Sequence, residues 1–421
     1  MNARELYPQG QTGLAARYRE VRARTEFLCA PLATEDYPIQ AVAEASPPKW
    51  HLAHVTWFFE AFVLKPFVPG YSAFHPLFDY LFNSYYESLG AFHPRALRGV
   101  LSRPATEEIY RYRGHVDARV LELLESGKSL APEALTRLEL GLHHEEQHQE
   151  LLLMDIKANF AMNPLRPAYR ATRERRAGSA SPLGWIEREG GLVEIGHDGR
   201  GFAFDNETPR HRVWLEPHRL ASRLVTNGEY LEFIAAGGYR QAQHWLSDGW
   251  ATVKARGWKA PLYWEQIDGE WWHMTLGGMA RVEDDAPVCH VSCYEADAFA
   301  RWSGGRLPTE VELERELASL PIAGNFMDSG VFGPRPAAAG NGQWFGDVWE
   351  WTSSPYTPYP GFRPLAGALG EYNGKFMANQ SVLRGGCCAT PQSHMRPTYR
   401  NFFYPHDRWM FAGIRLAEDA G

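Results

Sequence analysis

The chain has 421 residues, which is more than one hydrophobic core usually serves, so we expect two domains. Its 43 basic and 50 acidic side chains give a formal net charge of −7, and a mildly acidic chain binds nucleic acids and anionic membranes poorly. We therefore expect neither as a partner. With 44% hydrophobic and 22% charged residues, the composition also excludes a disordered or fibrous protein.

The amino-terminal sequence and the cysteines predict a cytoplasmic protein. The segment MNARELYPQGQTG lacks the apolar region of a signal peptide, and no apolar run approaches the roughly 18 to 20 residues that a membrane span needs. The five cysteines are scattered and form no CxxC pair, so we expect reduced thiols. Adjacent Cys387 and Cys388 are expected to be core residues, because neighbours on a strand point to opposite faces.

The first part of the chain is predicted to be helical. From about Leu14 to Met162, apolar residues recur at spacings of three and four, most clearly in TEEIYRYRGHVDARVLELLES and PEALTRLELGLHHEEQHQELLLMDIKANF. Thr106 before two glutamates and Pro132 after an alanine are typical helix starts. We expect four helices, and therefore a helical bundle over residues 1–165.

The rest of the sequence predicts a second domain of a different kind. Residues 166–183 are rich in basic residues and proline and lack apolar periodicity, as a connecting segment does. Residues 184–421 contain short apolar runs, frequent glycine and proline, many tryptophans and only a few helical pieces. We therefore expect an irregular α+β domain there, and an overall fold class of α plus α+β.

The segment HHEEQHQE predicts two metal ligands. His144 and His148 are four residues apart on a predicted helix, so they share one face and can bind one metal ion together. Glu150 would lie roughly 200° around the helix from His148, so we reject it as a ligand of that ion. A third ligand is expected from another helix.

The segment SPPKWHLAHVTWFFE supplies candidates for the third ligand. Pro47 and Pro48 open a helix on which His51 and His54 are three residues apart, and either can reach the interior of the bundle. For any single histidine the alternative is capping, packing or a solvated surface, but four histidines on two helices favour a metal site. Three neutral imidazoles leave coordination positions open to substrates, which is typical of a catalytic site.

These segments carry a family resemblance that spans nearly the whole chain. WHLAHVTWFFE, together with the two histidines and Glu150 of HxxxHxE, resembles the amino-terminal DinB-like four-helix bundle of the sulfoxide synthases of the ergothioneine pathway. The carboxy-terminal half resembles the domain of formylglycine-generating enzymes, which has a C-type-lectin-like fold. The matching segments are VTNGEYLEFI (225–234), PVCHVSCYEADAFARWSGGRLPTEVELE (287–314), FGDVWEWTSSPY (345–356), SVLRGG (381–386), MRPTYRNFFYP (395–405) and GIRLA (413–417).

The resemblance implies a non-heme Fe(II) enzyme. Members of this family use O2 to join the sulfur of cysteine or γ-glutamylcysteine to the imidazole carbon of N-α-trimethylhistidine, also called hercynine, and leave a sulfoxide. Carried over residue by residue, the family pattern makes His54, His144 and His148 the iron ligands. It implies that His51 contacts a ligand but not the metal, or that it is a core residue. The cysteine pair of the formylglycine-generating enzymes is replaced here by about Thr390 and Met395, so that chemistry is expected to be absent.

The resemblance also assigns a pocket for trimethylhistidine. Gln147 and Asn401 match positions that hold the imidazole or nearby waters. Without the resemblance, each would be an ordinary helix-surface or turn amide. The trimethylammonium group cannot donate a hydrogen bond, so aromatic side chains should bind it, and Phe402, Phe403 and Trp409 are the candidates.

Two further comparisons with the family concern the thiol substrate. Members that use γ-glutamylcysteine carry Trp-Asp where this chain has Phe402 and Phe403, and a phenylalanine cannot pair with the γ-glutamyl ammonium group, so cysteine is expected instead. Arg95 and Arg98 match positions that hold the carboxylate of the thiol substrate, a task that suits arginine. The alternative for this pair is a solvated basic loop.

A tyrosine donates a proton or hydrogen atom in the family, from a segment just before the Arg-Gly-Gly turn. In this chain that segment contains only Tyr372 and matches poorly, so we expect Tyr85 or Tyr86 of LFNSYYES to replace it. One of these two is expected in the core, because neighbours in sequence seldom both face a pocket. Removing the donor should divert the reaction to cysteine sulfinate.

Three other functions fit parts of the pattern. The same chemistry on unmethylated histidine would give an ovothiol-type product. A metal-dependent thiol transferase would turn over without O2, and a non-catalytic protein would bind metal or ligand without turnover. The sequence does not indicate the oligomeric state.

Overall fold

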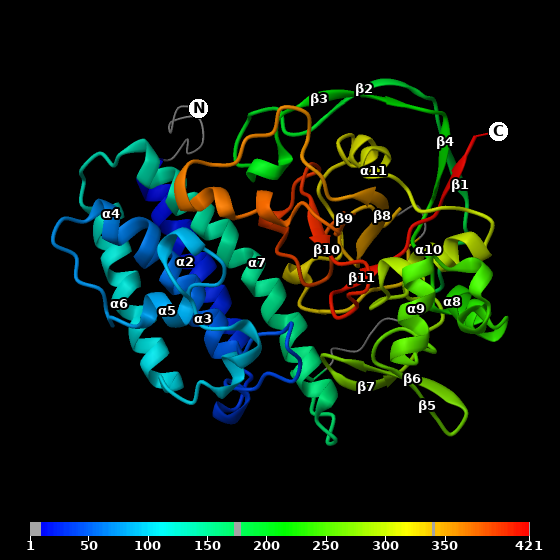
Figure 1. The fold of residues 1–421 in the computed structure, drawn as a ribbon, viewed down its shortest axis with the longest axis horizontal. Coiled ribbons are helices and arrows are strands. Elements are labelled where there is room, and N and C mark those ends of the chain that lie inside the picture. The colour runs from blue at the N-terminus through cyan, green and yellow to red at the C-terminus, as the bar shows by residue number, and fades with distance from the viewer. Residues whose placement is uncertain (1–9, 172–177, 339–341, 421) are drawn as a thin grey trace. The chain divides into compact units, whose positions relative to one another are not determined.

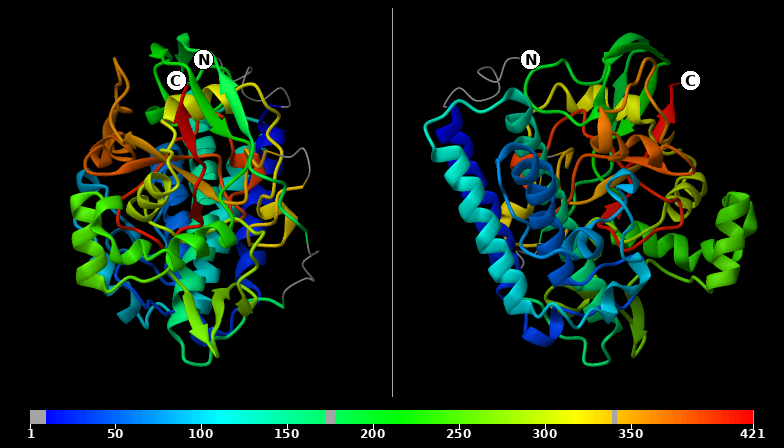
Figure 2. Two further views of the ribbon diagram at one scale, coloured as in Figure 1. Left: turned by 90° about the vertical axis from the view of Figure 1, so that its right-hand side faces the viewer. Right: turned by 60° about the vertical axis from the view of Figure 1, so that its left-hand side comes forward.

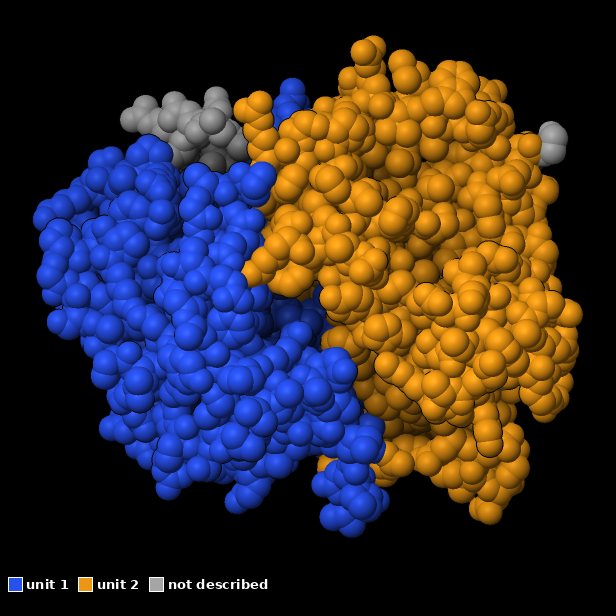
Figure 3. Space-filling model, in the orientation of Figure 1, with its two compact units in different colours: residues 1–165, 198–204, 364–372 blue, residues 166–197, 205–363, 373–421 orange. Residues whose placement is uncertain are grey.

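The computed structural model describes residues 10–171, 178–338 and 342–420 (Figure 1). Contacts between residues divide the chain into two compact units, coloured separately in Figure 3. Unit 1 comprises residues 1–165, 198–204 and 364–372, and unit 2 comprises residues 166–197, 205–363 and 373–421. Two short segments from beyond residue 165 therefore pack with the amino-terminal helices.

Unit 1 is a helical bundle. Its helices are α2 (Gly10–Cys29), α3 (Pro48–Phe59), α4 (Lys65–Phe67), α5 (Phe78–Phe82), α6 (Thr106–Glu125) and α7 (Pro132–Met162). The four long helices pack on one another: α2 contacts α6 and α7, and α3 contacts the same two helices. Figure 2 shows α2 and α6 running alongside each other. This is the predicted four-helix arrangement, with two short helices added after α3.

Helix α3 is buried on every side. Its sequence PKWHLAHVTWFF is apolar almost all round, which is typical of a helix enclosed by others, and all of its 12 residues are buried. The two prolines before Lys49 open the helix, with Pro48 in its first turn, where a missing N–H costs nothing. A five-residue π-helical turn, Glu60–Leu64, follows directly, and such turns are frequent near functional sites.

A buried ion network ties three helices of unit 1 together. The carboxylate of Glu145 on α7 accepts hydrogen bonds from Arg22 on α2 (2.9 Å) and from Arg113 on α6 (2.6 Å). Thr25 on α2 donates a third, at 2.6 Å. Burial raises the pKa of Glu145, but the two guanidinium groups outweigh it and lower the pKa to about 2. The carboxylate is therefore ionised at neutral pH.

Unit 2 is a mixed structure of short strands and short helices. Its largest sheet has the strand order β10 (Asn401–Phe403), β9 (Ser381–Arg384), β8 (Trp349–Pro355) and β11 (Ala412–Gly413). The first three strands are antiparallel to their neighbours, and β11 is parallel to β8. The other sheets consist of β1 (Trp185–Arg188), β4 (His218–Ala221) and β12 (Ala417–Asp419); β2 (Gly191–Ile195) and β3 (His211–Leu215); and β5 (Trp264–Ile267), β6 (Glu270–Thr275) and β7 (Gly278–Arg281).

The helices of unit 2 have clear start signals in the sequence. They are α8 (Asn227–Ala235), α9 (Ser247–Arg256), α10 (Cys293–Trp302) and α11 (Glu310–Leu317). Three of them begin with a capping box, in which a serine or threonine hydroxyl and a glutamate three residues later satisfy the free N–H groups at the helix start. The pairs are Thr226 with Glu229, Ser292 with Glu295, and Thr309 with Glu312.

The cysteines and the helix lengths agree with two of the expectations above. All five cysteines are buried, including Cys387 and Cys388, and none forms a disulfide. Burial raises the pKa of Cys388. Among the described helices, none is long and apolar enough to cross a membrane.

Candidate metal centre

Three histidines of unit 1 converge at the contact between α3 and α7. His54 on α3 and His144 and His148 on α7 each offer a ring nitrogen, and these three nitrogens lie within 4.8 Å of one another. The Nε2 atoms of His54 and His144 are 3.1 Å apart, and the rings of His144 and His148 have centroids 4.6 Å apart. The structure thus brings together the three residues predicted as ligands. Glu150 is not a member of this group, in agreement with its expected position away from His148 on the helix.

The three imidazoles are neutral. Burial and the neighbouring His144 lower the pKa of His54 well below its usual value, and burial lowers the pKa of His144 to about 3. Burial also lowers the pKa of His148, with His144 adding to the effect. A neutral ring keeps one nitrogen lone pair for a metal ion, so the protein holds this group in the ligating state.

The ring nitrogens that face away from the group have different surroundings. Nδ1 of His54 donates to the carbonyl oxygen of Phe82 at 2.6 Å. Nδ1 of His148 lies 2.9 Å from Nδ1 of His51, whose Nε2 lies 2.9 Å from Asp155 Oδ2. Nδ1 of His144 is buried and has no hydrogen-bond partner among the described residues. His51 therefore lies behind the group, as the family pattern implies.

This donor set fits a divalent transition metal ion. Imidazole nitrogen suits iron, copper, nickel and zinc, whereas magnesium and calcium prefer oxygen. Three protein ligands leave positions for substrates. The outer nitrogen of His54 has a backbone carbonyl as its partner, which is one of the groups that usually orient metal-binding histidines, and the outer nitrogen of His148 has His51. These residues could therefore hold a metal ion.

A buried arginine lies close to the histidines. The guanidinium of Arg98 stacks on the ring of Trp50, with its central carbon 3.4 Å from the ring centroid, and Trp50 in turn stacks on His54 at 4.5 Å. Arg98 donates to the hydroxyls of Ser46 (2.9 Å) and Ser84 (3.1 Å). Burial and the neighbouring Arg95 lower the pKa of Arg98.

Arg98 is a buried cation on which the carboxylate of Asp155 acts only by raising its pKa, against the larger effect of burial. Its side chain is 1% exposed, yet within the described part of the chain it forms no ion pair with a carboxylate, and its Nε has no acceptor. A buried charge without a partner is costly, so such an arginine is suited to bind a carboxylate from outside the protein. Arg95, the other predicted arginine, is exposed.

Tyr372 lies beside the histidine group. Its ring centroid is 5.8 Å from that of His144, and its ring stacks on Phe204 at 5.4 Å. Its hydroxyl donates a hydrogen bond to Oε1 of Gln147, the residue before His148. The segment around Tyr372 matches the family pattern poorly, so the sequence favours Tyr85 or Tyr86, and only the structure reveals this contact.

The carboxylate of Glu371 connects the segment that carries Tyr372 to residues 87 and 88. Glu371 accepts hydrogen bonds from the backbone N–H of Glu87 (2.9 Å) and of Ser88 (3.0 Å), and from the Ser88 hydroxyl (2.6 Å). The residues 85–90 are thereby joined to the segment 364–372. Tyr85 lies at this junction, with its ring centroid 6.4 Å from that of Tyr372.

The two predicted tyrosines differ in their surroundings. Tyr85 is half-buried, and its ring lies 4.7 Å from that of Tyr86. Tyr86 is buried against Trp57 and Phe62, and burial raises the pKa of its hydroxyl. One of the pair thus has a core environment, as expected for neighbours in sequence.

The remaining predicted residues lie in unit 2. Asn401, Phe402 and Phe403 make up β10, and Trp409 follows it closely in sequence. Phe402 stacks on Tyr356 with centroids 4.0 Å apart, and Phe403 meets Trp409 edge to face at 5.5 Å. The structure therefore places Phe402 and Phe403 in two separate aromatic contacts within unit 2, whereas the histidines, Arg98 and Gln147 belong to unit 1.

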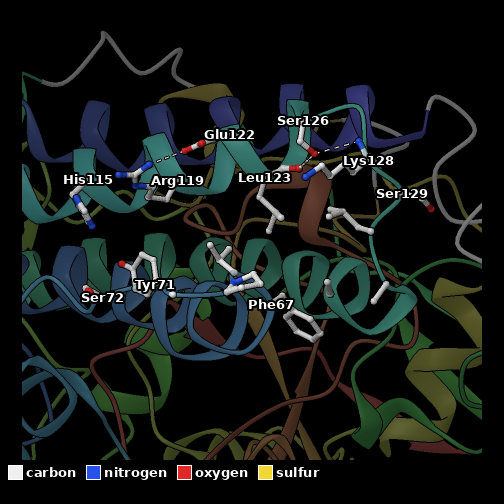
Figure 4. A pocket seen from close by; sticks show the side chains of 16 residues that line it. Phe67, Tyr71, Ser72, His115, Arg119, Glu122, Leu123, Ser126, Lys128 and Ser129 are labelled. Carbon is white, nitrogen blue, oxygen red and sulfur yellow. Dashed lines mark hydrogen bonds and ion pairs between the residues drawn. The ribbon is translucent and has the colours of Figure 1, made fainter.

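Unit 1 also has a cavity of about 700 Å³ that the metal group does not line. Figure 4 shows side chains of α6, among them His115, Arg119 and Glu122, on one side and Tyr71 and Phe67 on the other. Arg119 and Glu122 pair with each other at 2.8 Å. None of the residues predicted to be functional lines this cavity.

Comparison with known families finds a match to one family in the first part of the chain and to another in the rest. Residues 17–152 match the family described as DinB superfamily, and residues 176–329 and 322–420 match the family described as sulfatase-modifying factor enzyme 1-like domain. These matches confirm the predicted fold class, with a helical domain followed by a mixed one.

Comparison with individual proteins finds relatives over most of the chain. A protein named hercynine oxygenase from Mycolicibacterium thermoresistibile is 33% identical over 89% of this chain and 87% of its own length. Another of the same name from Mycolicibacterium smegmatis is 33% identical over 96% of this chain and 97% of its own. Ergothioneine biosynthesis protein 1 from Schizosaccharomyces pombe is 26% identical over 52% of this chain and 28% of its own length.

Proposed function

The chain belongs to the hercynine oxygenase family, and from this premise we propose that it uses O2 to join cysteine to trimethylhistidine as a sulfoxide, a step of ergothioneine biosynthesis. The C–H bond of the imidazole and the S–H bond of the thiol break, and a C–S bond forms. One oxygen atom stays on sulfur and the other leaves as water. The substrates thus supply all four electrons that O2 accepts, and no external reductant is needed.

One observation carries this proposal. In unit 1, Trp50 contacts both His54, which is one of the three neutral histidines, and Arg98. Arg98 is buried and has no carboxylate partner among the described residues. The histidines suit a redox metal ion, and the arginine suits the carboxylate of an amino-acid substrate. An enzyme that acts on an amino-acid thiol at a metal ion needs both groups close together.

Iron(II) is the metal ion we propose for His54, His144 and His148. Such an ion supplies the electron-transfer chemistry with O2 that protein side chains lack. The protein supplies neutral ligands, a tryptophan against the ligand His54, and a cation for the substrate.

Cysteine is the thiol substrate we propose. Phe403 stands where an aspartate would pair with the ammonium group of γ-glutamylcysteine, and a phenyl ring cannot form that ion pair. We assign the trimethylammonium group of the other substrate to aromatic side chains. Two of the candidates, Phe403 and Trp409, lie edge to face with each other. Gln147 and Asn401 are assigned to the imidazole of that substrate.

Replacing Arg98 by methionine should remove the preference for a thiol that carries a carboxylate. We expect KM for cysteine to rise about 10- to 100-fold, since a buried charge-assisted hydrogen bond contributes about 1.5–3 kcal/mol. Cysteamine, which lacks the carboxylate, should be used equally well by both proteins. Steady-state kinetics with the two thiols measure this.

The exposed Arg95 gives the matched control for this experiment. Arg95→Met should change KM for cysteine less than Arg98→Met, because its side chain lies in water. A larger effect at Arg95, or an equal loss with cysteamine in Arg98→Met, would contradict the assignment of Arg98.

The proton donor is proposed to be one of the tyrosines joined by the Glu371 contact. Tyr372 is added to Tyr85 and Tyr86 because its hydroxyl donates to Gln147 beside the histidines. Phenylalanine at the donor position should leave both substrates bound but shift the product from the coupled sulfoxide towards cysteine sulfinate. Quantifying both products for Tyr85→Phe, Tyr86→Phe and Tyr372→Phe identifies the donor, and unchanged ratios in all three variants would exclude the tyrosines.

Product analysis tests the function as a whole. The protein is loaded with Fe(II) without air and then exposed to O2 with trimethylhistidine and either cysteine or γ-glutamylcysteine, with histidine as an alternative acceptor. Mass spectrometry should detect a sulfoxide from cysteine and trimethylhistidine. A product only from γ-glutamylcysteine would overturn the reading of Phe403, and the absence of any coupled product would favour a binding protein.

A further inference from the structure

A buried chain of side chains leads from a carboxylate to one of the candidate ligands. Asp155 Oδ2 lies 2.9 Å from Nε2 of His51, and Nδ1 of His51 lies 2.9 Å from Nδ1 of His148. The backbone N–H of Ser46 donates to the same oxygen of Asp155 at 2.7 Å. Asp155 is 3% exposed and His51 is 2% exposed, so both act out of contact with bulk water.

The hydrogen bonds of this chain have a direction. The carboxylate of Asp155 accepts from Ser46 and, as an anion, can only accept from His51, so the proton of a neutral His51 is on Nε2. Nδ1 of His51 then offers a lone pair, and Nδ1 of His148 must donate to it. With a single proton on His51, this chain of hydrogen bonds would place the proton of His148 on Nδ1 and leave the lone pair on its Nε2.

We propose that Asp155 and His51 are positioning residues that hold His148 with its proton on Nδ1 and its Nε2 free for the metal ion. This inference rests on the proposed metal site. A carboxylate behind a metal-binding histidine is a common arrangement, and here a second histidine extends it by one ring. The two residues touch neither metal nor substrate in this assignment and act through His148.

The other two candidate ligands, His54 and His144, differ from His148 in what their Nδ1 atoms contact. Nδ1 of His54 donates to a backbone carbonyl, which can only accept, so the main chain sets the proton position there. Nδ1 of His144 has no partner among the described residues, so nothing described sets it. His148 is thus the ligand of this group whose proton position depends on side chains, those of His51 and Asp155, which can be changed by mutation.

The proton positions can be measured in the unmodified protein without metal. Nitrogen-15 NMR of histidine-labelled protein distinguishes a ring protonated on Nδ1 from one protonated on Nε2. The signals that disappear in His148→Gln and in His51→Gln identify the two rings. We expect the Nδ1–H form for His148 and the Nε2–H form for His51, and the opposite form of either ring would overturn the proposal.

Metal affinity gives the second test, with Co(II) as the probe in competition with a chelator. His51→Phe and Asp155→Leu should each weaken Co(II) binding by about 10- to 100-fold, the usual cost of losing an outer partner. Asp155→Asn keeps an acceptor oxygen and should retain most of the affinity. Equal losses in the Asn and Leu variants would overturn the proposal.

Asn159 provides a matched structural control one helical turn further along α7. It is buried and holds the backbone of Ala41 and Ile39, as Asp155 holds that of Ser46, but it is not part of the hydrogen-bonded chain to His148. Asn159→Leu should therefore leave Co(II) affinity unchanged, and a loss equal to that of Asp155→Leu would overturn the proposal. Neither test uses turnover, so failure to detect a sulfoxide would overturn the proposed function alone.

Discussion

Replacing His144 by leucine should abolish metal binding and turnover. The residue supplies one of three ring nitrogens within 4.8 Å of one another, and leucine offers no lone pair. Loss of the ligand itself should lower metal affinity by more than the about 100-fold that loss of an outer partner costs. Elemental analysis after Fe(II) loading measures the metal, and product formation measures the activity.

His143 is the matched control for this variant. It is the preceding residue on α7 and is also buried, but its ring stacks on Phe202 at 3.8 Å and is not part of the three-histidine group. His143→Gln should therefore keep the metal ion bound by His54, His144 and His148 and retain activity. Metal retained in His144→Leu, or lost equally in both variants, would contradict the assignment of the ligands.

Glu145→Gln should destabilise unit 1 strongly. The change removes the buried anion that Arg22 and Arg113 both contact and leaves them only the more exposed carboxylates of Asp117 and Glu26. Removing one partner of a buried ion pair typically costs about 3–5 kcal/mol. That is a large fraction of the roughly 5–15 kcal/mol that stabilises a folded domain. Urea unfolding at pH 7, followed by circular dichroism of the helices, measures the difference.

The same residue should make the stability depend on pH. Because folding lowers the pKa of Glu145 from 4.5 to about 2, its contribution is complete above about pH 4.5 and is lost as the pH falls towards 2. The shift corresponds to about 3 kcal/mol, so the gap in unfolding free energy between wild type and Glu145→Gln should narrow at low pH. A gap that stays constant down to pH 2 would contradict this.

Glu122 is the control for both measurements. It pairs with Arg119 on the surface of α6, and its side chain is 69% exposed. Exposed pairs contribute about 0–1 kcal/mol, so Glu122→Gln should hardly change the unfolding free energy. A loss as large as that of Glu145→Gln would show that burial does not explain the effect.

The sequence predicted the part of the site that lies on regular helices. His144 and His148 are four residues apart on α7, and this spacing alone requires a shared face. The resemblance added the choice of His54 over His51, which spacing left open. Asp155 could also have been found, because it follows His148 by seven residues and so returns to the same face of the helix.

The contacts of Tyr372 could not be predicted in this way. Its hydroxyl reaches Gln147 across a separation of 225 residues, and the intervening chain is mostly unit 2. Its segment contains a short 3-10 helix, Gly367–Glu371, with no apolar period that would reveal the face it buries. A hydrogen bond between distant loops depends on the fold as a whole, and helical spacing carries no information about it.

The Glu371 contact has a consequence for how this site tolerates change over evolution. Two of its three hydrogen-bond donors are main-chain N–H groups, so substitutions at Glu87 leave that part of the contact intact. A deletion of one residue between Pro364 and Glu371 would instead shift the carboxylate and the adjacent tyrosine relative to α7. Relatives that keep this arrangement should therefore vary freely in the identity of residue 87 but conserve the length of the segment 364–372.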